Sequence, residues 1–129
     1  MCVMNYDRAL LFGRWYRNDT DAKGNETGEY AELSADGSFE FTFVSTEQGI
    51  NRTKQVVELG DWGLVGNIHF TITKNELVDQ QLYAADLNNG DNYQAYKVLK
   101  LDHYTFEYQH IETKEIFKMR KITDNVGHC

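Results

Sequence analysis

The stretch Gly13-Arg14-Trp15-Tyr16 begins a series of strand-like segments that continues almost to the C-terminal end of the chain. Turns rich in Gly, Asn and Asp join the segments, and the clearest is Ala35-Asp36-Gly37, because Asp-Gly supplies residues that tolerate positive φ. About eight or nine short segments follow one another with no long crossover connection. The pattern predicts an all-β fold, a single antiparallel up-and-down β-barrel of about eight to nine strands.

Alternation of apolar and polar residues within these segments predicts which side chains face the barrel interior. Phe39, Phe41 and Phe43 fall on one face of their strand, with Glu40 and Thr42 on the other. Applied along the chain, this reasoning places His69 on the outer face. The residues expected to face inward are Tyr30, Phe39, Phe41, Phe43, Trp62, Phe70, Tyr96, Val98, Phe106, Tyr108 and Met119.

The chain of 129 residues is expected to form one domain. Residues 1–12 form an N-terminal segment that can fold as a short helix capping one barrel end, 13–122 form the barrel, and 123–129 form a C-terminal tail. Residues 76–91 suit either a strand or a short helix. Cys2 and Cys129 stand at opposite ends of the chain and fit no C-x-x-C spacing, so we expect two free thiols.

Charge and hydropathy exclude some classes of partner. The net charge of −7 disfavours contact with the phosphates of nucleic acids. No apolar run is long enough to cross a membrane, and residues 1–8 do not look like a secretion leader. We therefore expect a soluble cytoplasmic protein with neither nucleic-acid binding nor membrane insertion.

Four segments resemble those of lipocalin-type barrels of the calycin superfamily, in particular the compact bacterial lipocalin-like proteins: Gly13-Arg14-Trp15, Asp36-Gly37, Gly60-Asp61-Trp62 and Phe117-Lys118-Met119-Arg120-Lys121. The resemblance implies that Trp15 sits at the closed end of the barrel with Arg120 packed across its ring. The Thr-Asp-Tyr motif of classical lipocalins is absent, and so is the disulfide set of the secreted members. Avidin-like barrels also begin with Gly-x-Trp-Tyr, but two tryptophans are too few for a biotin site.

A lipocalin-like barrel with this lining favours a protein that binds a small, mainly apolar molecule. The ligand-binding residues would be Tyr30, Phe41, Trp62, Tyr96, Tyr108 and Met119. In the alternative, the rings fill the interior completely. The protein would then be a structural or interaction module that self-associates, for example as a homodimer, or binds a protein partner. The lining alone leaves these two alternatives open.

An enzyme, such as an isomerase or hydrolase with Glu58 or His110 as a base, is the least favoured class. No catalytic triad, metal-ligand spacing or phosphate-binding loop stands in the sequence. We accordingly predict no catalytic residue, no metal and no cofactor. Glu32 and Glu58 can each point inward and acquire a raised pKa. The favoured interpretation is a carboxylate at the barrel rim, paired with Lys97 or Arg120, because charges are rarely buried without partners.

Overall fold

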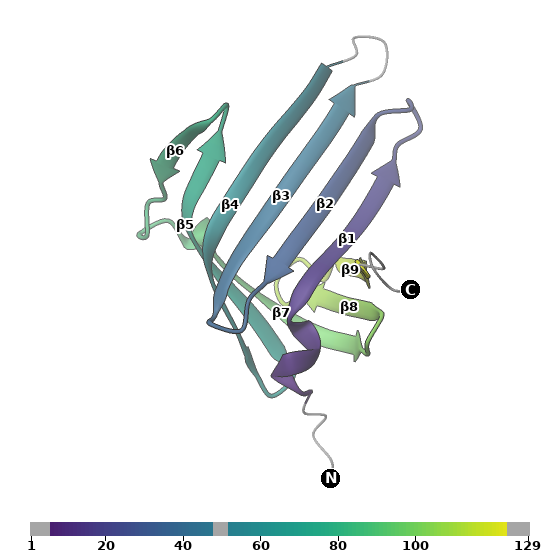
Figure 1. The fold of residues 1–129 in the computed structure, drawn as a ribbon, viewed down its shortest axis with the longest axis vertical. Coiled ribbons are helices and arrows are strands. Elements are labelled where there is room, and N and C mark those ends of the chain that lie inside the picture. The colour runs from purple at the N-terminus through teal and green to yellow at the C-terminus, as the bar shows by residue number, and fades with distance from the viewer. Residues whose placement is uncertain (1–5, 48–51, 124–129) are drawn as a thin grey trace, which may run out of the picture.

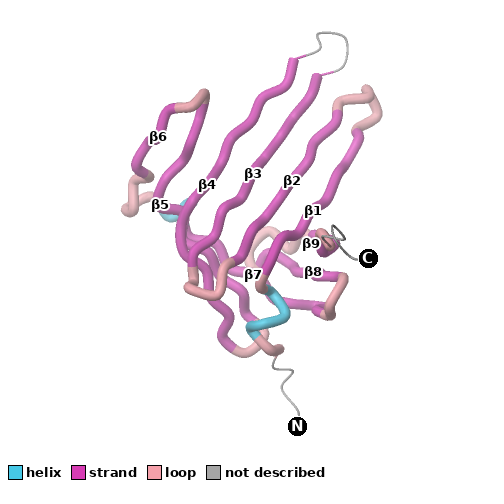
Figure 2. The backbone as a smooth tube through the Cα atoms, viewed as in Figure 1, coloured by secondary structure: helices cyan, strands magenta, loops and turns pink. Residues whose placement is uncertain are grey.

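The structure is a computed structural model that describes residues 6–47 and 52–123 (Figure 2). Cys2 and Cys129 lie outside the described residues, so the expectation of two free thiols stays a prediction.

Nine strands and two single turns of 3-10 helix make up the described chain. The helical turns are η1 (Arg8–Leu11) and η2 (Gly90–Asn92). The strands are β1 (Gly13–Thr20), β2 (Glu26–Leu33), β3 (Ser38–Glu47), β4 (Arg52–Val65), β5 (Ile68–Val78), β6 (Gln81–Ala84), β7 (Tyr93–Leu101), β8 (Thr105–His110) and β9 (Ile116–Lys121).

Eight of the strands close into a ring in which every described pairing is antiparallel. The order is β4-β3-β2-β1-β9-β8-β7-β5, and pairing of β4 with β5 completes the circle. β6 is an additional strand that pairs with β5. The predicted class, an all-β up-and-down barrel with a lipocalin-like arrangement, is confirmed. Of the expected N-terminal helix, the described residues from Tyr6 onward contain the four-residue turn η1.

The ring is closed along only part of its height because β5 has two partners on one edge. Its first half, Ile68 to Ile72, pairs with β7, whereas Asn75 to Val78 pair with β6. The pairing of β1 with β9 is equally short, because among the described residues only Trp15 and Tyr16 of β1 take part in it. The long strands β1 to β4 consequently rise above the short strands β7 to β9 as an open, curved sheet, which we call the trough (Figure 1).

The segment 76–91 is mainly extended. β5 continues to Val78 and turns back into β6 through Asp79 and Gln80, whose φ angles are 51° and 67°. Two consecutive residues with positive φ are the requirement of a type I′ hairpin turn. The strand alternative is therefore the correct one, and η2 provides only a three-residue helical turn after it.

The register of β4 and β5 shifts between the pairs Leu59↔Asn75 and Gly60↔Thr73, so Lys74 is an extra residue on β5 and forms a β-bulge at which this strand bends. At this position the main chain of β5 approaches so closely that a Cβ on Gly60 would lie 1.9 Å from the carbonyl oxygen of Ile72. Only glycine fits such a contact. The second Gly-x-Trp of the sequence thus begins opposite the bulge of β5.

The closed end of the barrel is built around Trp15, whose side chain is completely buried. Its Nε1 donates a hydrogen bond to the carbonyl of Leu11 in η1, at 3.0 Å. The cation over its ring is Lys121, with Nζ 4.7 Å from the ring centroid, and the same ammonium donates to the carbonyl of Phe12. The expectation that Arg120 closes the barrel is wrong, because side chains alternate along β9 and Arg120 points to the exposed outer face.

Candidate functional site

A cavity of about 170 Å³ remains between the inner faces of the strands. Six of the rings that line it are Trp15, Phe39, Phe41, Phe43, Phe106 and Phe117. An engineered apolar cavity of about 150 Å³ accommodates benzene. The barrel interior is therefore not completely filled, and the space left is that of one small ring with a short substituent.

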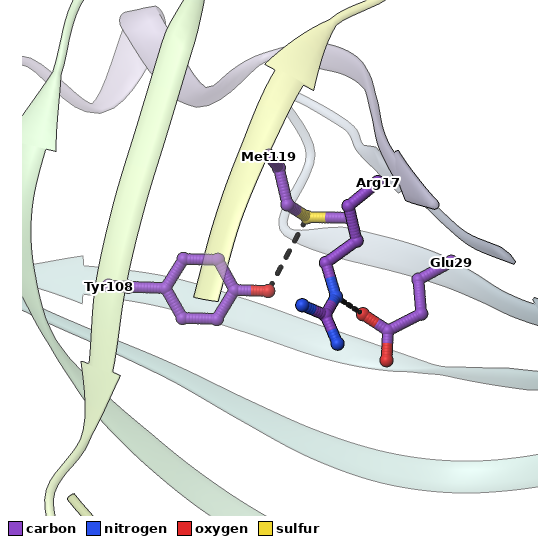
Figure 3. Close-up of polar contacts among 4 residues, drawn as sticks. All are labelled: Arg17, Glu29, Tyr108 and Met119. Carbon is purple, nitrogen blue, oxygen red and sulfur yellow. Dashed lines mark hydrogen bonds and ion pairs between the residues drawn. The ribbon is translucent and has the colours of Figure 1, made fainter. Parts of the chain in front are cut away.

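Four of the six predicted ligand-binding residues line this cavity: Phe41, Tyr96, Tyr108 and Met119. Tyr108 is buried, and its hydroxyl donates to Met119 Sδ at 3.4 Å (Figure 3). The ring of Tyr96 stands edge-to-face to that of Tyr108, with centroids 5.0 Å apart. Burial raises the pKa of Tyr96 to about 12, so both tyrosines keep their hydroxyl protons at neutral pH.

Tyr30 does not face inward, contrary to our expectation. Its side chain is 41% exposed, and the inward positions of β2 belong to Glu29, Ala31 and Leu33. Ala31 stands opposite Trp15 on one side and Phe41 on the other. Because directly opposed residues share a face of the sheet, two large rings leave room for only a small side chain between them.

Trp62 is buried but does not line the cavity. Its Nε1 donates to the carbonyl of Ser34 at 2.9 Å, and the guanidinium of Arg8 lies 4.6 Å from its ring centroid. The ring of Phe12 packs against it edge-to-face. Both tryptophans thus belong to the closed end of the barrel, and the prediction that Trp62 faces a ligand is wrong for this geometry.

The two faces of β5 are the reverse of those expected. His69 and Thr71 line the cavity, whereas Phe70 points outward. Across the pair, Phe70 faces Gly63, and a Cβ on Gly63 would lie 2.4 Å from the Phe70 ring. The absence of a side chain on Gly63 gives the ring of Phe70 a place on the outer surface of the sheet. The alternation of apolar residues on β5 alone does not show that Phe70 faces outward.

His69 is the most unusual polar group of the cavity wall, because its side chain is only 5% exposed and its Nδ1 has no hydrogen-bond partner among the described residues. The ring stacks on Tyr96 and meets Phe106 edge-to-face, with centroids 5.8 and 5.5 Å away. Burial lowers the pKa of His69 from 6.5 to about 4, and a hydrogen bond to the Gly63 backbone opposes this only weakly. The imidazole is therefore neutral at pH 7.

Glu58 lines the cavity, and Glu32 does not. Thr73 Oγ1 donates to Glu58 at 3.2 Å, and among the described residues no Lys or Arg pairs with the carboxylate. The expected ion pair with Lys97 or Arg120 is therefore absent from this part of the chain. Burial raises the pKa of Glu58, and the nearby carboxylate of Glu76 raises it further. Glu32 lies with Tyr30 on the outer face.

The trough contributes an ion pair that the sequence analysis did not identify. Arg17 Nε donates to the carboxylate of Glu29 (Figure 3). The Arg17 guanidinium also lies 5.1 Å from the ring centroid of Phe117. Strand alternation from the buried Trp15 would have placed Arg17 on the inner face. Glu29 lines the cavity, and its negative charge is balanced by Arg17.

His110 is fully engaged in local structure. Its Nε2 is hydrogen-bonded to Gln94 Oε1, and its Nδ1 accepts from the backbone N–H groups of Glu112 and Thr113. It has no free nitrogen with which to act as a base. Within residues 6–47 and 52–123, no group of three or more His, Cys, Asp or Glu side chains is arranged to hold a metal ion. No helix in the same ranges is long and apolar enough to cross a membrane.

Comparison with known proteins assigns this chain to no family. No protein-family model matches the chain, and no curated protein matches it. Among solved structures, it is similar to the crystal structure of a lipocalin-like protein from Bacteroides uniformis. The two chains are 16% identical, the alignment covers 88% of this chain and 99% of that one, and the TM-score is 0.49.

Proposed function

We propose that this protein binds a small, mainly apolar molecule in the cavity of its barrel. The observation that supports this is an interior space of about 170 Å³ whose wall is formed chiefly by aromatic rings, with a few polar groups among them. Such a composition is typical of small-molecule sites, although this cavity is smaller than most. Tyr96, Tyr108, Phe41 and Met119 are the proposed contact residues.

Native mass spectrometry of protein purified from its own host, combined with thermal shifts against a panel of small apolar compounds, tests the proposal. A ligand present at about a hundred times its Kd should stabilise the fold by about 2.7 kcal/mol. Ala31→Phe, which places a ring inside the cavity, should abolish the shift. The control Ala84→Phe puts the same ring on the exposed strand β6 and should keep the shift. An absence of any bound mass and any stabilisation would refute binding.

Self-association is a second candidate, and the edge of β6 supports it. Among the described strands, β6 pairs only with β5, and its Leu82 and Tyr83 are 62% and 51% exposed. An apolar edge strand of this kind can pair with a second copy. Sedimentation velocity over a range of concentrations should show dimers that Leu82→Lys abolishes and the control Leu99→Lys does not. A strict monomer at every concentration would rule it out.

A further inference from the structure

Two polar groups of the cavity wall, Glu58 and His69, have hydrogen-bond acceptors to spare. Glu58 receives one hydrogen bond, from Thr73, although a carboxylate can accept several. His69 Nδ1 receives none from the described residues. The Tyr108 hydroxyl is directed to Met119, and Gln94 is bonded through both its oxygen and its nitrogen. The hydroxyls of Tyr96 and Thr71, which also line the cavity, can accept as well as donate.

The free nitrogen of His69 is an acceptor because of what its other nitrogen does. The hydrogen bond to the Gly63 backbone raises the pKa of His69, as a carbonyl oxygen that accepts the ring proton would do. Because Nδ1 has no partner among the described residues, the nitrogen that carries this proton in the neutral ring is Nε2. Nδ1 therefore carries a lone pair, and leaving it buried without a donor is costly.

The electrostatic environment of the cavity is also negative. None of the described residues that line it is a Lys or Arg, and the nearby Arg17 is engaged with Glu29. The carboxylates of Glu58 and Glu29 both act on the hydroxyl of Tyr96. The faces of the surrounding rings carry partial negative charge, which attracts cations. The whole chain, at −7, adds a long-range field of the same sign.

We propose that the cavity binds a small organic ammonium ion carried on a single ring or a short apolar group, with Glu58 as its counter-ion. This inference rests on the proposed binding function and specifies the ligand's chemistry. An ammonium group has three donors and no acceptor, so it matches the spare acceptors of the wall, the Glu58 carboxylate and His69 Nδ1. Its apolar part fits the space of about 170 Å³ between the rings.

Other small ligands of the same size fit the wall less well. A hydrocarbon would leave Glu58 and His69 Nδ1 without donors in a site from which it displaces water. A carboxylate would meet the charge of Glu58 and the faces of the rings. A neutral alcohol supplies one donor but no charge. The three charge states on one ring scaffold therefore discriminate between these possibilities.

Isothermal titration calorimetry with benzylamine, benzyl alcohol and benzoate at pH 7 tests the inference on the full chain. Benzylamine is protonated at that pH, and we expect it to bind about tenfold or more tightly than benzyl alcohol, with no detectable binding of benzoate. In Glu58→Gln the amide oxygen still accepts from Thr73, while the charge is lost. The preference for the amine should then fall to about twofold or less. The control Glu32→Gln, on the outer face, should keep the full preference.

Two results would overturn the inference: equal affinity of the wild type for the amine and the alcohol, or an amine preference that Glu58→Gln leaves unchanged. The first result uses the wild type alone, so the inference can be refuted even if Glu58→Gln does not fold. If neutral apolar compounds produce a thermal shift that Ala31→Phe abolishes and benzylamine does not bind, the inference fails while the proposed function stands. If no compound of either panel binds, both fail.

Discussion

Replacing His69 by Phe should remove a large part of the acid sensitivity of this fold. The folded-state pKa of His69 is about 4, compared with 6.5 for an ordinary histidine. Between pH 6.5 and about pH 4, His69 is protonated in the unfolded chain but stays neutral in the folded chain. The stability contributed by the neutral ring is therefore fully present above pH 6.5. This contribution to the free energy of unfolding decreases as the pH falls from 6.5, and below about pH 4 it no longer changes. At about 1.4 kcal/mol per pH unit, the full loss is about 3 kcal/mol.

Urea unfolding at pH 7.5 and pH 5.0 measures this effect. At pH 5.0 most of the difference is already expressed, so the wild type should lose about 2 kcal/mol more than His69→Phe between the two conditions. Carboxylates titrate in both proteins, and their contributions cancel in the comparison. The control His103→Phe removes an exposed imidazole from a turn and should follow the wild type. Parallel curves for the wild type and His69→Phe would show that the buried ring is not what makes the fold acid-sensitive.

Two further predictions concern the barrel wall. Lys121→Met removes the cation over Trp15 and its hydrogen bond, and should lower the free energy of unfolding by about 1 to 3 kcal/mol, whereas Arg120→Met on the exposed face should change it by less than about 0.5 kcal/mol. Equal effects of the two substitutions in urea unfolding would contradict this account of the closed end. Gly60→Ala should cost about 3 kcal/mol or more, because its Cβ meets a backbone carbonyl, and Gly90→Ala, with open space around it, should be nearly neutral. A soluble Gly60→Ala protein that unfolds at the wild-type urea concentration would show that the main chain of β5 moves away from this position without cost.

The architecture could be predicted from the sequence because its evidence is local. Turn residues and the regular spacing of short apolar segments indicate antiparallel hairpins, and sequential hairpins favour a closed meander. On β3 the alternation of three phenylalanines with Glu and Thr is unambiguous, and Phe39, Phe41 and Phe43 all line the cavity. The split pairing of β5 is different, since it depends on strands that are far apart in the chain.

The site was predicted less well because side-chain size and long-range pairing decide which face is inward. On β2 side-chain hydrophobicity favours Tyr30 as the inward residue, but Trp15 and Phe41 leave room between them only for the small side chain of Ala31. On β5 the apolar face turned out to be the outer one, so His69 was assigned to the wrong side. Neither reversal follows from hydrophobicity alone, because a one-residue change of phase moves every side chain to the other face.

The divided pairing of β5 separates the fold into two parts that are expected to open independently. Amide protons of the closed ring, where β5 meets β7, can exchange with solvent only when the whole sheet comes apart. Those of the β5–β6 hairpin and the upper ends of β1 to β4 belong to an incomplete wall and should exchange through small local fluctuations. A ligand that enters between the β5–β6 hairpin and the upper ends of β1 to β4 reaches the aromatic rings without breaking the β5–β7 hydrogen bonds that close the barrel. The rate of ligand binding should therefore not depend on the rate of global unfolding.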